Sequence, residues 1–399
     1  VYKRQLAKDL NETVNPRVAA ISPSGIRSFD AHVSKIPGIV KLTIGEPDLN
    51  VPEHVKQAAV QSIVENDSHY TSNRGKIELR KAISGYLERT RGVHYDPETE
   101  IVATVGATEA LAATIFSLIN EGDKVIIPTP AFSLYFPLVS LAGGTPVQVD
   151  VSEDDFVLTP ELLENVLKKE GPAVKAVLLN YPVNPTGREY PREVLEGLAK
   201  VIADHHLYVF ADEIYSDLVY GVEHTSMATL LPDRTIFISG LSKSHAMTGY
   251  RMGYFAGPKE AIDNITKLHS FLVTSITDST QAAAIEAYTN GDEDPVKARA
   301  IYQKRRDYVL KSLNDMGIET VPPQGAFYIF AKIPASYGTD DMQFALDLAK
   351  EAQVGVTPGN AFGAGGAGWV RLSYAASDED LHTAMERMKP FIEKVNAKN

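Results

Sequence analysis

The sequence contains no cysteine among its 399 residues. This absence excludes disulfides, thiolate nucleophiles, iron–sulfur clusters and zinc sites built on cysteine. The histidines do not compensate, because His69, His205, His206 and His245 show no metal-ligand spacing beside acidic partners. We therefore expect no metal site, so that any chemistry comes from lysine, aspartate, tyrosine, histidine or a cofactor.

Long hydrophobic runs and an excess of basic residues are also missing. No apolar segment approaches the roughly 18 residues that suggest a membrane span, and segment 1–13 is charged without an apolar signal core. The 51 acidic residues outnumber the 39 basic ones, and the net charge of −12 disfavours attraction to nucleic acid or to an anionic membrane. We expect a cytoplasmic protein with neither partner, in which local arginines hold any anionic ligand.

What the sequence does contain is an alternation of apolar and amphipathic segments. At 399 residues and 44% hydrophobic, the chain exceeds the usual single-domain size and predicts two domains. Apolar runs rich in β-branched residues predict buried parallel strands at 101–106, 124–130, 176–182, 207–213 and 235–240. Segments such as EALAATIFSLINEG and REVLEGLAKVIADHH are long enough to be crossover helices. The middle of the chain is therefore predicted to be α/β with a mostly parallel sheet.

The pattern changes after Pro295. One long helix with a basic face is followed by the strand-like segments GAFYIFAKI and WVRLSYA and by a closing amphipathic helix. The N-terminal segment ends in KLTIGEPD, a short strand broken at Gly45 and Pro47, and is expected to pack beside the C-terminal part. We predict a large domain at 48–290 and a smaller α+β domain formed by 1–47 and 291–399.

One glycine-dense stretch, 359–369, invites a different interpretation. Gly363, Gly365 and Gly368 have the G-x-G-x-x-G spacing of dinucleotide-binding loops. That spacing is functional between a strand and a helix, whereas here it precedes the predicted strand WVRLSYA. We favour a flexible loop, and a nucleotide-binding regulator or oxidoreductase is the alternative from another class of function.

The strongest local signal is SGLSKSHAMTGYRMGY at 239–254, where a strand is predicted to end in Ser242 and Lys243. Burial at a strand end lowers the pKa of a lysine from about 10.4 and provides a neutral amine of the kind that forms Schiff bases. Arg251, which follows a turn at Gly249, can hold a phosphate in bidentate fashion. A solvated surface lysine is the alternative.

Other polar and aromatic residues follow neighbouring strands. Gly106, Ala107 and Thr108 lie where a strand meets a helix N-terminus, whose free N–H groups attract phosphate, although Thr108 as a simple helix cap is the alternative. The remaining candidates each have a structural alternative as a turn, a helix cap or a core residue; they are Asn184, Asp212, Tyr215 and Phe132.

Arg371 lies inside the apolar segment WVRLSYA. A permanent charge is costly there unless a carboxylate meets it. Either a bound carboxylate or an acidic residue of the protein satisfies this requirement.

Taken in this order, the segments resemble the class I and II aminotransferases across nearly the whole chain. The resemblance implies a fold type I enzyme that uses pyridoxal 5′-phosphate (PLP), with Lys243 as the lysine bound to the cofactor. It also implies Asp212 beside the pyridine nitrogen, Asn184 and Tyr215 on the 3-oxygen, and Phe132 stacked on the ring.

Further roles come from the same resemblance. The segment 106–108 and Arg251 are expected to hold the phosphate. Arg371, Asn184 and the backbone of Gly45 are expected to face the substrate. Tyr70, in HYTSNRG, corresponds to a residue that reaches the cofactor phosphate of the neighbouring subunit, which implies a homodimer.

Two positions depart from the family pattern. Many relatives carry a phosphate-binding serine three residues before the lysine, where this chain has Gly240, and Ser242 is the candidate to replace it. Thr108 stands where some aspartate aminotransferases carry a lysine for the second carboxylate of the substrate.

The resemblance favours an aminotransferase that moves the amino group of an aromatic L-amino acid to a 2-oxo acid such as 2-oxoglutarate by a ping-pong mechanism. The segments GATEAL, GLSKSHAMTG and VRLSYAAS are equally similar to those of N-acetyl-diaminopimelate aminotransferases. That activity and an aspartate aminotransferase are alternatives, and a PLP-dependent carbon–sulfur β-lyase is another.

Overall fold

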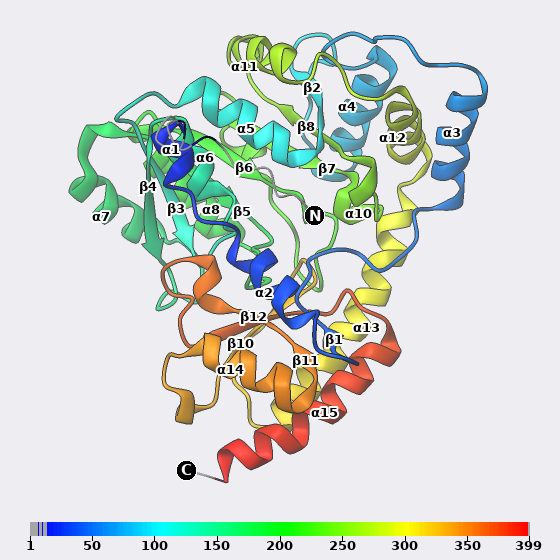
Figure 1. The fold of residues 1–399 in the computed structure, drawn as a ribbon. Coiled ribbons are helices and arrows are strands. Elements are labelled where there is room, and N and C mark those ends of the chain that lie inside the picture. Colours follow the sequence, from blue (N-terminus) through cyan, green and yellow to red (C-terminus); the bar gives the residue numbers. More distant parts are fainter. Residues whose placement is uncertain (1–6, 8–9, 11–13, 398–399) are drawn as a thin grey trace.

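A seven-stranded sheet organises the middle of the chain in the computed structural model, which describes residues 7, 10 and 14–397 (Figure 1). Its strands, in spatial order, are β2 (Ile101–Val105), β8 (Met252–Ala256), β7 (Thr235–Gly240), β6 (Tyr208–Asp212), β5 (Val174–Asn180), β3 (Lys124–Thr129) and β4 (Thr145–Asp150). The pairs from β7 to β4 are parallel, whereas β8 is antiparallel to both of its neighbours. The predicted, mostly parallel sheet is confirmed.

Helices cover both faces of this sheet, as expected for buried parallel strands. One apolar core joins the sheet to α5 (Gly106–Leu118), α6 (Tyr135–Leu141) and α11 (Lys259–Leu272). On the opposite face, one end packs against α3 (Glu53–Val64), α4 (Ile77–Arg91) and α12 (Asp278–Asn290). The other end of that face packs against α7 (Pro160–Glu170), α8 (Arg192–Asp204) and α9 (Met227–Leu230). Because the strands from β7 to β4 are parallel, their carboxyl ends lie at the same edge of the sheet.

A second, smaller sheet has its own core. It is antiparallel, with the order β12 (Thr357–Pro358), β13 (Trp369–Ser373), β10 (Tyr328–Lys332) and β9 (Thr320–Val321). Around it lie α13 (Glu293–Asp315), α14 (Asp341–Asp347) and α15 (Asp378–Asn396). Figure 1 shows α13 running from the seven-stranded sheet down to the smaller one.

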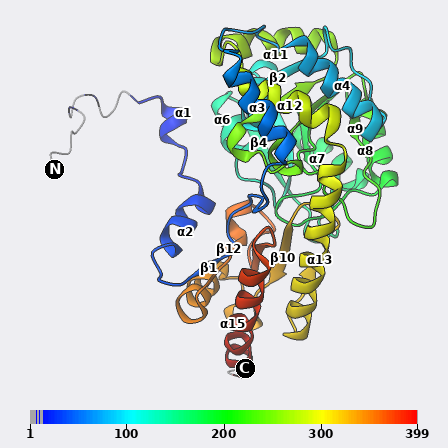
Figure 2. The same ribbon diagram turned by 90° about the vertical axis from the view of Figure 1, so that its right-hand side faces the viewer.

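The N-terminal segment joins this smaller part. The short strand β1 (Val40–Lys41) pairs in parallel with β11 (Val354–Gly355), which confirms the expected packing beside the C-terminal part. Figure 2 shows α1 (Pro16–Ala19) and α2 (Gly25–Val33) standing to one side of the layered parts. Among the described residues, no helix combines the length and the apolar character needed to cross a membrane.

Three local expectations and one alternative were wrong. Among the described residues, the strand at 101–105 pairs only with β8 and is antiparallel to it, whereas it was expected to be parallel; β8 was not among the predicted strands. Lys243 lies in α10 (Leu241–Ser244), a single helical turn after β7, and not in the strand itself. The long helix α13 begins at Glu293, since proline is tolerated in a first helical turn. The helix after β2 begins at Gly106, so Thr108 is not its cap.

Candidate functional site

The candidate site starts at the carboxyl ends of three adjacent strands. Asn180 at the end of β5 pairs with Asp212 at the end of β6, and β7 ends next to them at Gly240. Open α/β sheets place ligands at this edge. The Asn180 side chain donates to the Asp212 carbonyl at 3.0 Å and accepts from the Asn184 N–H at 3.0 Å. The loop that carries Asn184 is thereby tied to the strand that carries Asp212.

Lys243 lies beside this edge and is half-buried. Its Nζ donates to the Gly45 carbonyl at 2.7 Å. Burial lowers the pKa of Lys243 to about 8, and the nearby Arg371 and Arg251 act in the same direction. Near neutral pH about a tenth of this amine is therefore neutral, far more than for an exposed lysine, and the neutral form can act as nucleophile and base.

Asp212 is buried beneath the same site. Its carboxylate accepts from the Tyr135 hydroxyl at 2.8 Å and from the Ile214 N–H at 3.3 Å. Burial raises the pKa of Asp212 to about 6 in spite of these hydrogen bonds. A cationic group facing Asp212 would stabilise the ionised carboxylate.

Arg371 comes from the smaller sheet, and its side chain is buried. Its two terminal nitrogens donate to the Asn184 side-chain oxygen at 2.8 Å and to the Thr43 carbonyl at 2.5 Å. Within the described part of the chain, no acidic residue pairs with Arg371, and its Nε has no hydrogen-bond partner. A salt bridge to a protein acid is therefore the wrong explanation for this arginine, and a buried positive charge remains for a ligand carboxylate.

Two tyrosines connect the two sheets at this point. The hydroxyl oxygens of Tyr215 and Tyr328 lie 2.7 Å apart. The Arg371 guanidinium carbon lies 4.4 Å from the centroid of the Tyr328 ring. A Cβ at Gly45 would lie 1.9 Å from the Tyr328 hydroxyl, so this close approach requires glycine.

The start of α5 forms a second polar corner. Gly106 has φ +76°, and a Cβ there would lie 2.5 Å from an Arg251 nitrogen. A Cβ at Gly253 would lie 2.4 Å from the Ala107 amide nitrogen. Two glycines therefore let the helix N-terminus, with its unpaired N–H groups, approach β8 and the Arg251 guanidinium. Thr108 is exposed in the first turn of this helix.

Of the other predicted residues, one lies beside the site and one does not. Phe132 is half-buried and packs edge-on against Tyr135, with ring centroids 5.8 Å apart. Tyr70 lies between α3 and α4 and is 89% exposed, so within one chain it is not part of the cluster.

Gly240 has a packing reason for lacking a side chain. A Cβ at this position would lie 2.4 Å from the Met252 carbonyl oxygen in the neighbouring strand. A serine here would require β8 to shift. Ser242, the proposed replacement, is buried in α10.

The residues that are present fit PLP. The N-terminus of α5 and Arg251 offer donors for a phosphate, buried Asp212 favours a cationic ring nitrogen, and Lys243 supplies the amine. The unpaired Nε of buried Arg371 fits a substrate carboxylate in the same site. Fold and site together define a fold type I PLP-dependent transferase.

The chain belongs to the class I and II aminotransferase family, whose model matches residues 37–388. It is therefore a PLP-dependent transaminase. A Bacillus subtilis protein named "Probable N-acetyl-LL-diaminopimelate aminotransferase" is 41% identical, with 96% of this chain and 97% of that protein covered. The aromatic-amino-acid aminotransferase 2 of Thermococcus litoralis is 37% identical, with coverage of 96% and 98%.

Solved structures agree in fold. The aspartate aminotransferase of Thermus thermophilus with maleate has a TM-score of 0.89 at 37% identity and covers 94% of this chain and 99% of that one. An aromatic aminotransferase from Pyrococcus horikoshii has a TM-score of 0.87 at 37% identity, with coverage of 92% and 99%.

Sequence reasoning missed Tyr135, Tyr328, Thr43 and Asn180. Tyr135 is the first residue of α6 and lies three residues after Phe132 in the same strand-end segment, PTPAFSLYF, which was the available signal. Tyr328 gives no such signal, because its place beside Arg371 depends on the pairing of β10 with β13.

Proposed function

We propose that this aminotransferase takes an aromatic L-amino acid as donor and 2-oxoglutarate as acceptor. The main observation in favour of amino acid substrates is that Arg371 is buried without an acidic partner among the described residues, in the same site as Lys243 and Asp212. Relatives named for aromatic amino acids support the donor class. Aromatic rings also surround the carboxylate position, since Tyr328 and Phe362 lie 4.4 and 5.0 Å from the Arg371 guanidinium.

The proposed roles follow from these positions. Arg371 and Asn184 bind the α-carboxylate of the substrate, and the Gly45 backbone borders it. When PLP is bound, Asp212 would keep its pyridine nitrogen protonated, Asn184 and Tyr215 would hold its 3-oxygen, and Phe132 would pack on its ring. PLP, when bound, supplies a ring that withdraws electrons from the Cα of the substrate. Lys243 takes the proton from Cα and delivers it to the cofactor side, a positioned transfer worth about 10²- to 10⁴-fold.

We further propose the division into a cofactor domain at 48–290 and a smaller domain at 1–47 and 291–399, together with a homodimer in which Tyr70 reaches the partner's cofactor phosphate. The seven strands of the large sheet all fall within the first of these segments. Arg371 and Lys243 lie on different sides of this division, so movement of the smaller part would change the carboxylate site.

A panel of amino donors with 2-oxoglutarate tests the function. We expect phenylalanine and tyrosine to convert the visible band of the enzyme and to give the highest kcat/KM. Aspartate or N-acetyl-LL-diaminopimelate as the best donor would replace the aromatic proposal with one of these alternatives, the second of which the 41% identical relative favours. Pyruvate release from cystathionine without amino transfer would indicate a β-lyase instead.

The Lys243→Ala variant is the control for this panel. It should fold, because Lys243 lies in a single helical turn, and should lose conversion of the band with every donor. Transamination at the wild-type rate in this variant would remove Lys243 from the proposal.

A further inference from the structure

Tyr328 touches three parts of the site at once. Its hydroxyl lies 2.7 Å from that of Tyr215, its ring lies under the Arg371 guanidinium at 4.4 Å, and its hydroxyl occupies the space that a Cβ at Gly45 would need. The side chain is 1% exposed, so these contacts replace any contact with solvent.

The position of Tyr328 follows from strand register. In the antiparallel pair β10–β13, Phe330 lies opposite Arg371 and Tyr328 lies opposite Ser373. Residues two apart in a strand share a face, so Tyr328 is the diagonal neighbour of Arg371. The smaller sheet thereby places the Tyr328 ring beside the Arg371 guanidinium.

The role proposed for Tyr215 determines which hydroxyl is the donor in its hydrogen bond with Tyr328. A tyrosine hydroxyl has one proton to donate. If Tyr215 gives its proton to a hydrogen bond with the 3-oxygen of the cofactor, the 2.7 Å contact requires Tyr328 to donate to Tyr215. A donor behind Tyr215 strengthens the hydrogen bond in front of it.

We propose that Tyr328 is a positioning residue that aligns the Tyr215 hydroxyl toward the cofactor and holds the Arg371 guanidinium for the substrate carboxylate. This inference rests on the roles proposed for Tyr215 and Arg371. Stacking on the ring stabilises the guanidinium without using its N–H groups, so Nε stays available to a ligand. A paired glutamate in the same place would compete with the substrate for Arg371.

Tyr328→Phe separates the hydroxyl from the ring. The variant keeps the stacked ring, so the Kd of 3-phenylpropanoate, a carboxylate that cannot be transaminated, should stay within about 2-fold of wild type when measured calorimetrically on the loaded enzyme. The weaker hydrogen bond from Tyr215 should leave the 3-oxygen with more electron density. The pH midpoint at which the visible band titrates should therefore rise by about 0.5 to 1 unit.

Tyr374→Phe is the matched control. Tyr374 is also buried beside the smaller sheet and donates to the Ala326 carbonyl at 3.1 Å, without a contact to Tyr215 or Arg371. Its band should titrate as in wild type. Equal midpoints in Tyr328→Phe, Tyr374→Phe and wild type would overturn the role of the Tyr328 hydroxyl.

Tyr328→Leu removes the ring as well. The Kd of 3-phenylpropanoate should then rise by about 5-fold or more, and an unchanged Kd would overturn the support of Arg371. The proposed function fails separately: a wild-type enzyme that converts no amino donor, but whose band still shifts in Tyr328→Phe, would leave the positioning role intact.

Discussion

Asp212 illustrates how a residue that suits a bound cofactor can lower the stability of the protein prepared without that cofactor. Its pKa of about 6 lies above the ordinary 3.8 because the carboxyl is buried. The cost of ionising Asp212 in the folded state is absent below pH 3.8 and complete above pH 6. Within the described residues, the side-chain hydrogen bond that offsets part of this cost comes from Tyr135.

Asp212→Asn should therefore stabilise the protein prepared without PLP while impairing the loaded enzyme. The gain in unfolding free energy should grow between about pH 4 and pH 6 to on the order of 2–3 kcal/mol and then stay constant up to pH 8. With PLP bound, transamination should fall by at least about 10²-fold, because the ring nitrogen loses its anionic partner. Thermal melts of apoprotein across this pH range and steady-state rates measure both effects.

Asp204→Asn is a suitable control, since Asp204 is exposed at the end of α8. It should change neither quantity. An Asp212→Asn apoprotein that is less stable than wild type at pH 8 would contradict the argument from burial.

At the scale of elements, the end of β6 is held by a buried charge cluster next to Asp212. His224 lies between Glu189 at 2.9 Å and Glu213 at 2.8 Å, and Tyr181 stacks on its ring. Glu213 also accepts from the hydroxyls of Tyr181 and Ser226. The two carboxylates raise the pKa of His224 to about 9 although burial opposes this. Burial also raises the pKa of Glu189, but a cation between two carboxylates is the state that the contacts favour.

The sign of the resulting pH dependence follows from this shift. A histidine whose pKa rises on folding contributes stability fully below its unfolded value of 6.5 and loses it as pH rises through 9. The wild type should lose on the order of 2 kcal/mol from this cluster between pH 6.5 and pH 9.5. His224→Gln should be less stable at pH 6.5 and should lack this loss.

Melting temperatures across this pH range measure the effect. His205→Gln, at a partly exposed pair with Glu164, should keep the wild-type profile. Parallel profiles for wild type and His224→Gln would show that His224 is not charged at pH 6.5.

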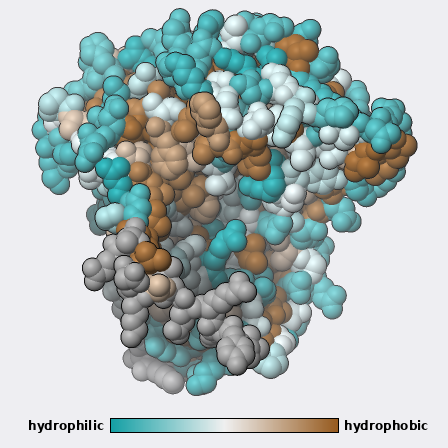
Figure 3. Space-filling view, turned by 45° about the horizontal axis from the view of Figure 1, so that its top comes forward, coloured by the Kyte–Doolittle hydropathy of each residue, from teal (hydrophilic) through white to brown (hydrophobic). Residues whose placement is uncertain are grey.

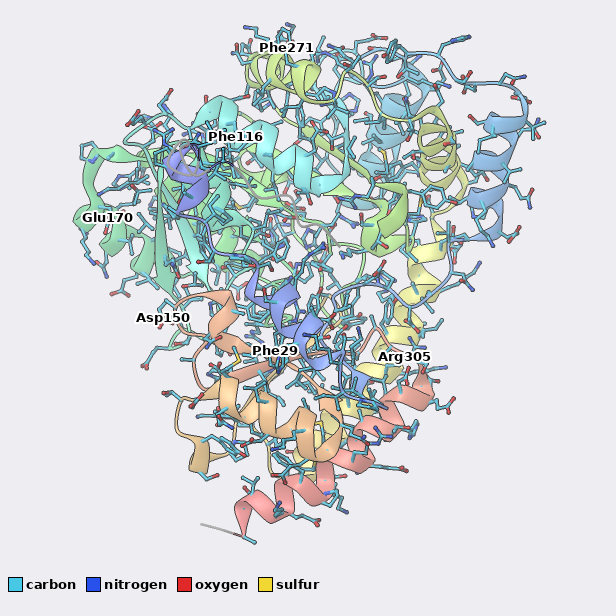
Figure 4. The ribbon with its side chains drawn as sticks, in the orientation of Figure 1. Phe29, Phe116, Asp150, Glu170, Phe271 and Arg305 are labelled. Carbon is cyan, nitrogen blue, oxygen red and sulfur yellow. The ribbon has the colours of Figure 1, made fainter. Side chains whose placement is uncertain are left out.

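The glycine loop 363–368 is a second element whose role is structural. It leads into β13, as expected, and contacts the edge of the large sheet: a Cβ at Gly365 would lie 2.2 Å from an Asp150 oxygen. The Ala364 N–H donates to the Gln148 side chain at 3.0 Å. Figure 4 shows Asp150 where the upper part of the molecule meets the lower one. A nucleotide-binding interpretation of the loop is wrong, because a strand and not a helix follows it.

Gly365→Ala should push this loop away from β4 and disturb the start of the strand that carries Arg371. We expect KM for the amino donor to rise by about 5-fold or more, with PLP still bound. Gly317→Ala is the control, since Gly317 has the same φ of +74° as Gly365 but its Cβ would meet no atom within 4 Å. Equal KM values for the two variants would mean that the contact with β4 is unimportant.

For the whole molecule, the exposed apolar residues on α3 and at the end of α11 favour the proposed dimer. Val60, Ile63 and Val64 on α3 are 54–67% exposed, and Phe271 at the end of α11 is 91% exposed. Figure 3 shows a hydrophobic group at the right-hand edge, on the side where Figure 1 places α3, and Figure 4 shows Phe271 projecting from α11. Such patches are typical of interfaces.

Light scattering should give twice 43.5 kDa, or 87 kDa, for the wild type. Phe271→Asp should shift the mass toward 43.5 kDa at low protein concentration and raise the Kd for PLP, because Tyr70 of the second subunit is then lost. Met342→Asp, at an exposed apolar residue of α14, is the control. A wild-type mass of 43.5 kDa would contradict the dimer.

The sequence by itself determined the fold class and the chemical type of the site. Buried parallel strands are continuous apolar runs, so their ends could be located and the residues that follow them collected. Lys243, Asp212 and Asn184 were found in this way, because each lies within a few residues of a strand end. The absence of cysteine and the resemblance of the local segments then narrowed the chemistry to PLP.

Tertiary structure decided everything that depends on contacts between distant segments. The antiparallel strand β8, the Tyr135–Asp212 hydrogen bond and the place of Tyr328 beside Arg371 all arise from register and packing. Whether Arg371 faces a protein acid or a ligand was likewise open, because an acidic partner can come from anywhere in the chain. Among the described residues, the fold places a carbonyl, an amide and two aromatic rings around the guanidinium and no acidic residue.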